Sequence, residues 1–494
     1  MTRVARFASH VGAVLVVLIA AACTVGPQYR GPPPVATATI QAASFRRATP
    51  EAVSGVPTVA EWWEALQDPD LTATIRQALQ NSPNIKLAEA RVRESRASLR
   101  EKRLDRAPKS SASAAYIHAG LPNGFASSLS SFDLYSLNFD ASWEVDLFGG
   151  TRRAIEVAAT EAAAVEADLA DAQVQLAAET AHAYFDLRDA QQRLELVRAS
   201  AEIEKRMLSL TEQRRARGVA SDLDVERVRT QLEGTQAKMI PLDASIDESL
   251  DQLAVLTGQP PGALDATLET LRPLPSLPAT VAVADPAALL QQRPDIRAAE
   301  RRLASGNARI GQRMAGWFPK LTLLGDLGFS SPDPGKVVGS DTLTWLALPT
   351  LQWNMPDFGR VRAQVRQADA QYDEAQAQYM GTVLGALRDA ETALSRYAHQ
   401  RQAAVALRNV ESSASRSATL TEQRYRAGTC AALDWLDAER TRYAAEQDRV
   451  AADAQLLNDY VALQKALGLG WRPVQLARNQ GVGPGGRPVQ LTRN

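Results

Sequence analysis

The hydrophobic positions of this chain follow two different periods, and the change between them marks the predicted elements. In "SLNFDASWEVDLF", residues 136–148, every second residue is apolar and the residues between are polar. This period of two predicts a β-strand with one apolar and one polar face. In "LTWLALPTLQW", residues 343–353, most apolar residues share one face, although Leu346 and Leu348 fall on the other. Two shorter strands are expected before these, at 111–118 and 320–329.

Helical spacing of apolar and Ala residues predicts the remaining elements. One helix is expected over 71–106, ending before Pro108 because proline has no amide hydrogen to donate. After the strands, Gly149 and Gly359 mark turns from sheet to helix, and each is followed by a helical pattern of about 67 residues. Such a helix is about 100 Å long at 1.5 Å per residue. Its Ala-rich face must therefore pack against other long helices.

The chain consists of two copies of one unit. A shift of 210 residues superimposes identical residues without a gap, namely Trp143 on Trp353, Phe148 on Phe358, Gly149 on Gly359, Gly218 on Gly428 and Asp224 on Asp434. Upstream, a shift of 211 places Pro108 on Pro319. Gly218 and Gly428 each end a long helix, so each copy contains a long helical hairpin.

The repeats predict the organisation of the whole chain. It comprises a signal peptide at 1–22, a lipidated extended segment at 23–70, a first repeat at 71–262, a Pro-rich linker at 263–285, a second repeat at 286–471 and a flexible tail at 472–494. Each repeat holds a helix, two strands and the helical hairpin. The tail repeats "RPVQLARN" as "RPVQLTRN", and we assign it no function.

The predicted strands have the length that crosses a bilayer as part of a tilted, closed sheet. Four strands are too few to close, and an open edge in lipid would leave backbone groups unpaired. Several chains would then have to contribute to one closed sheet. Two exposed hairpins in a soluble protein are the alternative, but the Trp residues near the strand ends favour a membrane interface.

The N-terminal residues resemble a bacterial lipoprotein signal. Arg3 and Arg6 precede an apolar run, and small residues lead to Cys23, whose thiol would carry the lipid. An ordinary signal with an incidental Cys is the alternative. Thr24 after the Cys, by the same resemblance, favours the outer membrane. The other cysteine, Cys430, has no partner left within the chain, so no disulfide framework is expected.

Charge and motifs give little support to nucleic-acid binding or catalysis. The formal net charge is -1 and Arg residues alternate with acids, so no basic stripe for nucleic acid exists. Glu179 and His182 form one Glu-x-x-His step, but a di-metal centre needs a second. No phosphate-binding loop of the GxxxxGK type is present. We expect neither an enzyme nor a metal site, and no cofactor apart from covalent lipid on Cys23.

Four stretches, taken in order, resemble the TolC-like outer membrane efflux family, in its lipoprotein branch serving resistance-nodulation-division pumps. They are "CTVGPQYRGPP", "EWWEALQDPDL", the pair "DLFGGTRR" and "MPDFGRVR", and "RYRAGTCAALDWLDAER". The resemblance implies a mainly α-helical homotrimer with membrane β-strands, in which three chains form a 12-stranded barrel and a periplasmic helical tunnel. It further implies a periplasmic adaptor, an inner-membrane pump and the export of drugs or other small toxic compounds.

The same resemblance assigns roles to residues at the hairpin ends. Asp434 and Asp437 match carboxylates that narrow the tunnel entrance, and Tyr425 and Asp224 match residues that tie neighbouring helices in the closed state. Gly218 and Gly428 match the tips at which the adaptor docks. Helix capping by Asp434, packing by Tyr425 and helix termination by the glycines are the plainer alternatives. Cys430 replaces an Arg of better-known members, which removes one charge-assisted lock.

Two other functions fit parts of the sequence. A channel of the same family could serve one-step protein secretion through another adaptor. A purely structural coiled-coil lipoprotein could span the periplasm, but it would need neither the alternating strands nor the acidic pair near the hairpin end.

Overall fold

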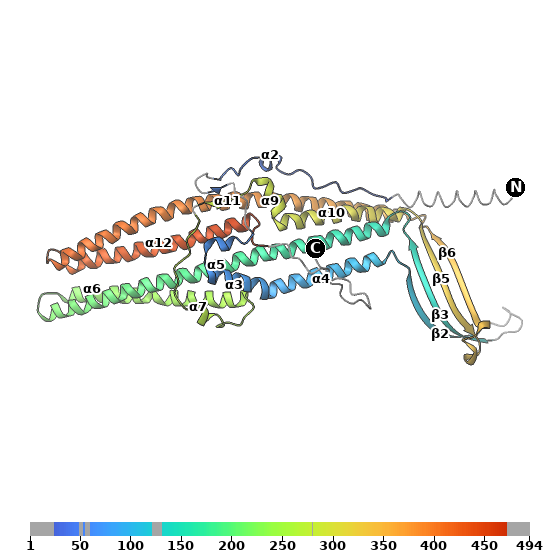
Figure 1. The fold of residues 1–494 in the computed structure, drawn as a ribbon, viewed down its shortest axis with the longest axis horizontal. Helices are drawn as coiled ribbons and strands as arrows, with labels where there is room; N and C mark the ends of the chain where they lie inside the picture. Colours follow the sequence, from blue (N-terminus) through green and yellow to red (C-terminus); the bar gives the residue numbers. More distant parts are fainter. Residues whose placement is uncertain (1–23, 49–52, 55–59, 121–130, 279, 472–494) are drawn as a thin grey trace, which may run out of the picture. The chain divides into compact units, whose positions relative to one another are not determined.

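The computed structural model describes residues 24–48, 53–54, 60–120, 131–278 and 280–471 (Figure 1). The predicted signal peptide, the predicted lipidation site Cys23 and the tail 472–494 lie outside the described residues. Among the described residues, no helix has a stretch that is both long and apolar enough to span a membrane.

The first repeat contains five helices and two strands within its described part. They are α3 (Pro69–Asn81), α4 (Pro83–Leu104), β2 (Lys109–Gly120), β3 (Ser131–Val145), α5 (Gly150–Ala216), α6 (Asp222–Ala237) and α7 (Met239–Leu256). The expected single helix over 71–106 is wrong, because α3 ends before Ser82 and Pro83 begins α4. Proline cannot donate the backbone hydrogen bond that would continue α3, whereas it fits the first position of a new helix.

The second repeat follows the same order. Its elements are α9 (Pro286–Gln292), α10 (Pro294–Met314), β5 (Lys320–Ser331), β6 (Leu343–Gln352), α11 (Arg360–Arg426) and α12 (Ala432–Ala466). Short elements complete the described chain, namely α2 (Thr37–Ile40), β1 (Val53–Ser54), η1 (Trp62–Leu66), α8 (Asp265–Leu268), β4 (Val281–Ala282), η2 (Ala315–Trp317), η3 (Pro334–Lys336) and η4 (Ser340–Thr342). Both long helices, α5 and α11, have 67 residues, which confirms the long helices predicted by the periodicity.

Four long strands form one antiparallel sheet in the order β2-β3-β5-β6 (Figure 1). All four predicted strands are confirmed, although β3 begins and ends earlier than the alternation alone indicated. The sheet therefore joins the two repeats through β3 and β5, and it leaves β2 and β6 as its edges. β1 and β4 form a separate parallel pair.

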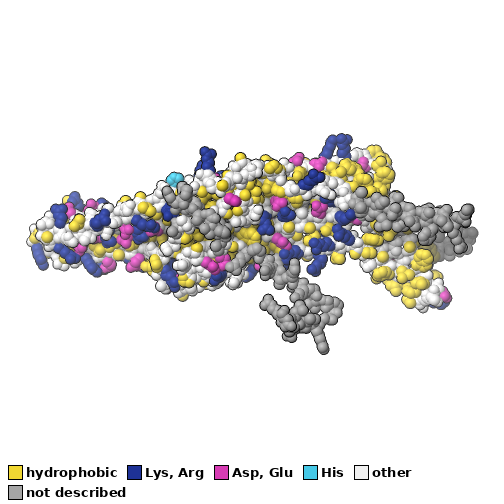
Figure 2. Space-filling model, turned by 45° about the horizontal axis from the view of Figure 1, so that its top comes forward, with side chains coloured by type: hydrophobic (Ala, Val, Ile, Leu, Met, Phe, Trp, Pro, Cys, Tyr) yellow, Lys and Arg dark blue, Asp and Glu magenta, His cyan; other side chains and the backbone are white. Residues whose placement is uncertain are grey.

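The two faces of the sheet differ in chemistry. Residues directly opposite in register share a face, as Phe139, Leu327 and Trp345 do. The apolar face presents exposed large side chains from three strands: Leu137, Phe139 and Trp143, Leu323 and Leu327, and Leu343, Trp345 and Leu351. Figure 2 shows hydrophobic side chains gathered over the strands. The other face is mainly polar, with Asn138, Asp140, Glu144, Thr322 and Asp326 in register, but it also carries Leu346 and Leu348.

The described residues divide into two compact units, and each unit draws on both repeats. One unit comprises the described residues within 1–50, 80–172 and 284–398, and it contains the sheet, α4 and α10. In it, α10 and α5 are linked by ion pairs of Arg302 with Asp168 and of Arg309 with Glu161, both at 2.5 Å. Gly311 lies where an added Cβ would meet Arg153 and Val25, so the absence of a side chain lets the N-terminal segment pack on α10.

The other unit comprises the described residues within 51–79, 173–283 and 399–494, and it contains both hairpin ends. Its core includes Tyr184, Phe185 and Leu187 of α5, all with no exposed surface. Arg188 is 1% exposed and donates to the carbonyl oxygens of Leu268 and Thr270, at 3.1 and 2.9 Å. These bonds fix the chain between the repeats against α5.

Candidate functional site

The first hairpin turn connects α5 to α6 through Gly218. Its φ of 73° lies in the left-handed region, and the amide of Val219 donates to the carbonyl oxygen of Arg214 at 2.9 Å, which ends α5. Ser221 then begins α6 with a reciprocal cap. The Asp224 amide donates to Ser221 Oγ at 3.2 Å, and the Ser221 amide donates to Asp224 Oδ2 at 3.0 Å. The backbone and hydroxyl hydrogen bonds from Ser221 lower the pKa of Asp224.

The second turn, between α11 and α12, has the same backbone but only half of that cap. Gly428 has a φ of 72°, and the amide of Thr429 donates to the carbonyl oxygen of Arg424 at 2.9 Å. Asp434 accepts a hydrogen bond from the Ala431 amide at 2.9 Å. Ala431 occupies the position equivalent to Ser221. It has no hydroxyl group that could form a hydrogen bond with Asp434. The cap of α12 therefore has one side-chain hydrogen bond, from the Ala431 amide to Asp434, where the cap of α6 has three between Ser221 and Asp224.

Asp437, the other carboxylate assigned to the entrance, lies one turn further along α12. It forms an ion pair with Arg440 at 2.5 Å, and both side chains are mostly exposed. Arg440, a cation of the same helix, therefore lies against the Asp437 carboxylate. The spacing of three residues between Asp437 and Arg440 could have revealed this pair in the sequence.

Tyr425 packs within its own hairpin. Its ring stacks on Trp435 with centroids 5.2 Å apart, and the Trp435 indole donates to Glu439 at 3.4 Å. Cys430 Sγ lies 3.5 Å from the carbonyl oxygen of Thr421. Trp435 was not singled out from the sequence, because its contact depends on the turn bringing α11 and α12 together.

Below the turns, the two hairpins share a small apolar core. Met207 of α5, Val228 of α6 and Leu436 of α12 are buried against one another. A cavity of about 220 Å³ lies next to them, lined from one hairpin by Met207, Thr211, Arg214, Val219, Ala220, Asp224 and Val228, and from the other by Ala431, Ala432 and Leu433. The hairpin ends therefore meet through a shallow core with unfilled space, an arrangement that permits them to separate.

The sheet-to-helix turns lie in the other unit. Gly149 and Gly359 have φ values of 80° and 86°, which a side chain would strain. Asp146 accepts hydrogen bonds from the amides of Thr151 and Arg152 at the start of α5, at 3.2 and 2.9 Å. Asp357 accepts from the amides of Gly359 and Val361 at 3.0 and 2.9 Å, and these bonds lower its pKa.

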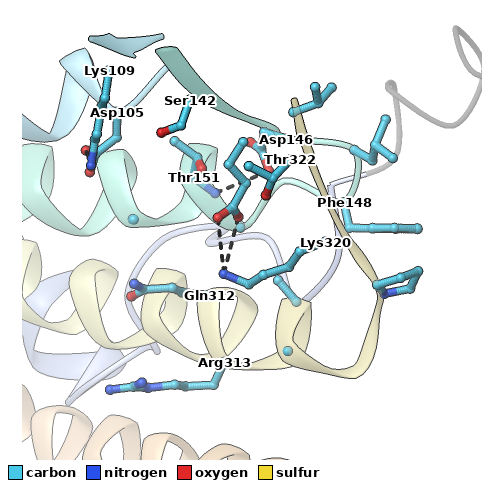
Figure 3. A pocket seen from close by; sticks show the side chains of 18 of the residues that line it. Asp105, Lys109, Ser142, Asp146, Phe148, Thr151, Gln312, Arg313, Lys320 and Thr322 are labelled. Carbon is cyan, nitrogen blue, oxygen red and sulfur yellow. Dashed lines mark hydrogen bonds and ion pairs between the residues drawn. The ribbon is translucent and has the colours of Figure 1, made fainter. Parts of the chain in front are cut away.

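A cavity of about 520 Å³ opens beside the first of these turns, on the polar face of the sheet (Figure 3). Lys109 pairs with Asp105 at 3.1 Å, and Lys320 pairs with Glu144 at 3.3 Å. Arg313 also lines the cavity. The mixed charges and the wide opening suit a hydrated passage, and we find no arrangement of these side chains that resembles a catalytic site.

The two repeats form equivalent hydrogen bonds where the strands of the sheet meet the helices. The indole of Trp143 donates to the carbonyl oxygen of Arg106 at 2.9 Å, and the indole of Trp353 donates to that of Trp317 at 3.2 Å. Both bonds tie the end of one strand to the segment that leads into its partner strand. The internal duplication seen in the sequence is thus preserved in the structure.

Comparison with known proteins gives matches over both repeats. The family model described as "Outer membrane efflux protein" matches residues 74–259 and 286–469. Outer membrane protein OprJ of Pseudomonas aeruginosa is 31% identical, over 93% of this chain and 96% of that protein. The toluene efflux pump outer membrane protein TtgC of Pseudomonas putida is 30% identical, over 91% of this chain and 93% of its own length.

Solved structures agree in fold. The outer-membrane channel OprN superimposes with a TM-score of 0.84 and 35% sequence identity, covering 91% of this chain and 100% of that chain. The CmeC outer membrane channel of Campylobacter jejuni has a TM-score of 0.82 at 22% identity, covering 92% and 96%.

Proposed function

Because the chain belongs to the TolC-like outer membrane efflux protein family, we propose that three copies of it assemble into one efflux channel of the outer membrane. Members of this family are channel proteins and not enzymes. The channel passes drugs or other small toxic compounds that an inner-membrane pump delivers, and a periplasmic adaptor joins the pump to it. The relatives include a toluene efflux pump protein, which supports this class of cargo.

The open sheet is the observation that carries the proposal. Within the described residues, β2 and β6 each pair with one strand only, while one face of the sheet is apolar and exposed. In lipid, each unpaired backbone group at such an edge costs several kcal/mol. Pairing β6 of one copy with β2 of the next removes the edges, and three sets of four strands give a closed sheet of twelve. The polar face then lines the passage.

The hairpin ends would close the other end of the passage. Asp434 and Asp437 of three copies place six carboxylates about one axis, and such a ring attracts cations and resists joint ionisation. Arg440 offsets part of that charge, because it pairs with Asp437. Tyr425 and Asp224 hold the two turns in shape, through Trp435 and Ser221 respectively. Gly218 and Gly428 form the exposed ends that the adaptor contacts.

Covalent lipid on Cys23 would add a second attachment to the membrane. Thr24, the next residue, packs against Gly149 at the start of α5, where an added Cβ would lie 2.6 Å from Thr24 Cγ2. The chain after Cys23 is thereby fixed beside the sheet. A lipid on Cys23 would enter the bilayer next to the strands. The proposed channel needs no cofactor besides this lipid.

Ionic current through the purified protein in a planar bilayer tests the gate. We expect cation-preferring steps in the native protein, and larger steps without that preference in the Asp434→Ala/Asp437→Ala variant. Arg440→Ala is the matched variant, and its expected effect is the opposite. It removes the cation that pairs with Asp437, so cation preference should increase. Steps with the same selectivity in all three proteins would refute the acidic gate and leave the channel in place.

A further inference from the structure

Phe358, between β6 and α11, is a large hydrophobic residue whose side chain is almost fully exposed. It is 94% exposed, the largest exposed fraction among the exposed large hydrophobic residues. Its φ of 50° lies in the left-handed region, which a bulky residue adopts at a cost. Within one copy, hydrogen bonds from the Gly359 and Val361 amides to Asp357 hold this backbone, but the ring of Phe358 is left uncovered.

The equivalent residue of the first repeat, Phe148, is covered. Its ring stacks on Phe318 with centroids 4.5 Å apart and an angle of 18° between planes. Phe318 lies directly before β5, the strand that pairs with β3. Phe148 is thus covered by the segment that leads into the next strand of the sheet.

The two phenylalanines share much of their local surroundings, although of the two only Phe358 has a positive φ. Both are followed by a glycine of positive φ, Gly149 or Gly359, and both are preceded by a Trp that donates to the equivalent carbonyl oxygen. The neighbouring strand differs as well. β3 has β5 beside it, whereas β6 is the last strand of the sheet.

The internal repeat identifies what would cover Phe358. The shift of 211 residues that places Pro108 on Pro319 also places Ala107 on Phe318, directly before β2. Ala107 is exposed, and Leu104, one turn earlier at the end of α4, is 63% exposed. β2 is the other free edge of the sheet, so a second copy offers β2 and its lead-in together.

We propose that Phe358 packs against Leu104 and Ala107 of a second copy of this chain, repeating between copies the contact that Phe148 makes with Phe318 within one copy. The inference rests on the proposed function, because it assumes that further copies close the sheet. Beyond that function, the inference names an apolar contact that stabilises each interface between copies. The left-handed backbone of Phe358 aims the ring at the neighbouring copy instead of back at its own chain.

Paired cysteines test the contact in the full-length chain. In a Cys430→Ser background, the Phe358→Cys/Leu104→Cys variant is treated with a short thiol-thiol crosslinker after purification. We expect bands of two and three linked chains on a denaturing gel without reductant. The matched control is Phe148→Cys/Phe318→Cys, which should crosslink within one chain and give no larger species. Each single-cysteine variant should give only unlinked chains. These variants also control for crosslinks through Cys23.

Truncation of the same two rings gives a second readout. Phe358→Ala should raise the protein concentration at which complexes dissociate by about ten-fold or more, as expected for loss of most of one buried aromatic side chain. Phe148→Ala removes the same ring from the equivalent position and should leave the dissociation concentration within about two-fold of native. The Phe148→Cys/Phe318→Cys crosslink within the Phe358→Ala chain verifies that the junction still folds.

The outcomes separate this inference from the proposed function. Three-chain complexes that conduct but never crosslink Phe358→Cys to Leu104→Cys would overturn the contact and leave the channel standing. Equal effects of Phe358→Ala and Phe148→Ala on association would also overturn it. A chain that folds and remains single would overturn both.

Discussion

The ring of Tyr425 stacks on that of Trp435, with centroids 5.2 Å apart and planes inclined by 24°, so the last turn of α11 contacts the first turns of α12. Trp435 also adjoins the apolar core that both hairpins share around Met207 and Leu436. One indole therefore stabilises its own hairpin turn and joins it to the neighbouring hairpin. In the proposed channel, this places an aromatic contact directly beside the carboxylates of the gate.

Trp435→Ala should loosen the second hairpin end. The loss of the stacked pair and of apolar contact costs about 2 kcal/mol or more, which corresponds to about thirty-fold faster local opening. Hydrogen exchange of the amides in 425–436 measures this opening, and current steps in a planar bilayer should become larger. Val225 occupies the equivalent position of the first repeat, so Val225→Ala is the control that should affect only α6. Unchanged exchange around Tyr425 in Trp435→Ala would contradict the role of the stack.

The helix caps after the two turns differ by the hydroxyl of Ser221, and moving this hydroxyl should change the stability of both caps. Ser221→Ala removes one side of the cap on α6 and should cost about 1 kcal/mol, or about five-fold faster exchange of the first amides of α6. Ala431→Ser supplies the missing hydroxyl to α12 and should slow exchange of its first amides by a similar factor. If Ala431→Ser leaves α12 unchanged, Asp434 is oriented differently from Asp224 and the equivalence of the two caps fails.

Asp224 makes the first turn sensitive to acid. Its pKa is lowered in the folded chain by hydrogen bonds from Ser221, so the stabilising effect is complete at a pH above the ordinary carboxyl value of about 4. It is lost as the pH falls through the lowered pKa, because the carboxyl group then gains a proton and no longer accepts both bonds. Exchange at the start of α6, corrected for the intrinsic effect of pH, should rise below about pH 4. Asp224→Asn should show a flat profile over the same range.

Arg188 should be essential to the unit that contains α3, α7 and α12. It is 1% exposed. It donates to Gln191, to the carbonyl oxygens of Leu268 and Thr270, and to the Asp70 carboxylate at 3.4 Å. Arg188→Met leaves these acceptors buried and should cost about 3 kcal/mol, near the lower end expected for breaking a buried pair, because Asp70 keeps Arg272.

Hydrogen exchange in 69–81 and 264–272 should then accelerate by about a hundred-fold, the factor that corresponds to that energy. Arg193 lies on the same helix, is 36% exposed and pairs with Asp189 within α5. Arg193→Met is therefore the matched control and should change exchange by less than about three-fold. Similar effects of both substitutions would show that Arg188 is an ordinary surface residue in solution.

Periodicity and internal repetition predicted most of this fold. The alternation in 136–148 and the long helical patterns after Gly149 and Gly359 are local signals, and the elements lie where those signals place them. The break at Pro83 was missed, since a long run of helical spacing on both sides outweighed one proline. The cap of Ser221 with Asp224 and the pair of Asp437 with Arg440 are also local, and their spacing of three residues was available in the sequence.

Long-range contacts could not be predicted in this way. Arg188 resembles any other Arg of a long helix, and its burial depends on segments about 80 and 118 residues away that fold over it. The exposure of Phe358 also reflects the sheet order, because only the finished sheet shows that β6 is an edge strand, paired on one side alone. The roles of Asp434, Asp437, Tyr425, Asp224, Gly218 and Gly428 at a gate, and of Cys23 in lipidation, stay predictions.

The number of chains in the purified complex tests the central claim most directly. Native mass spectrometry of the full-length protein, released from a mild detergent, measures that number without reference to transport. The account predicts a single species with three times the mass of the lipidated chain, because three copies convert sheets of four strands into one closed sheet of twelve. A folded protein that remains a single chain, or that assembles in another number, would contradict the account.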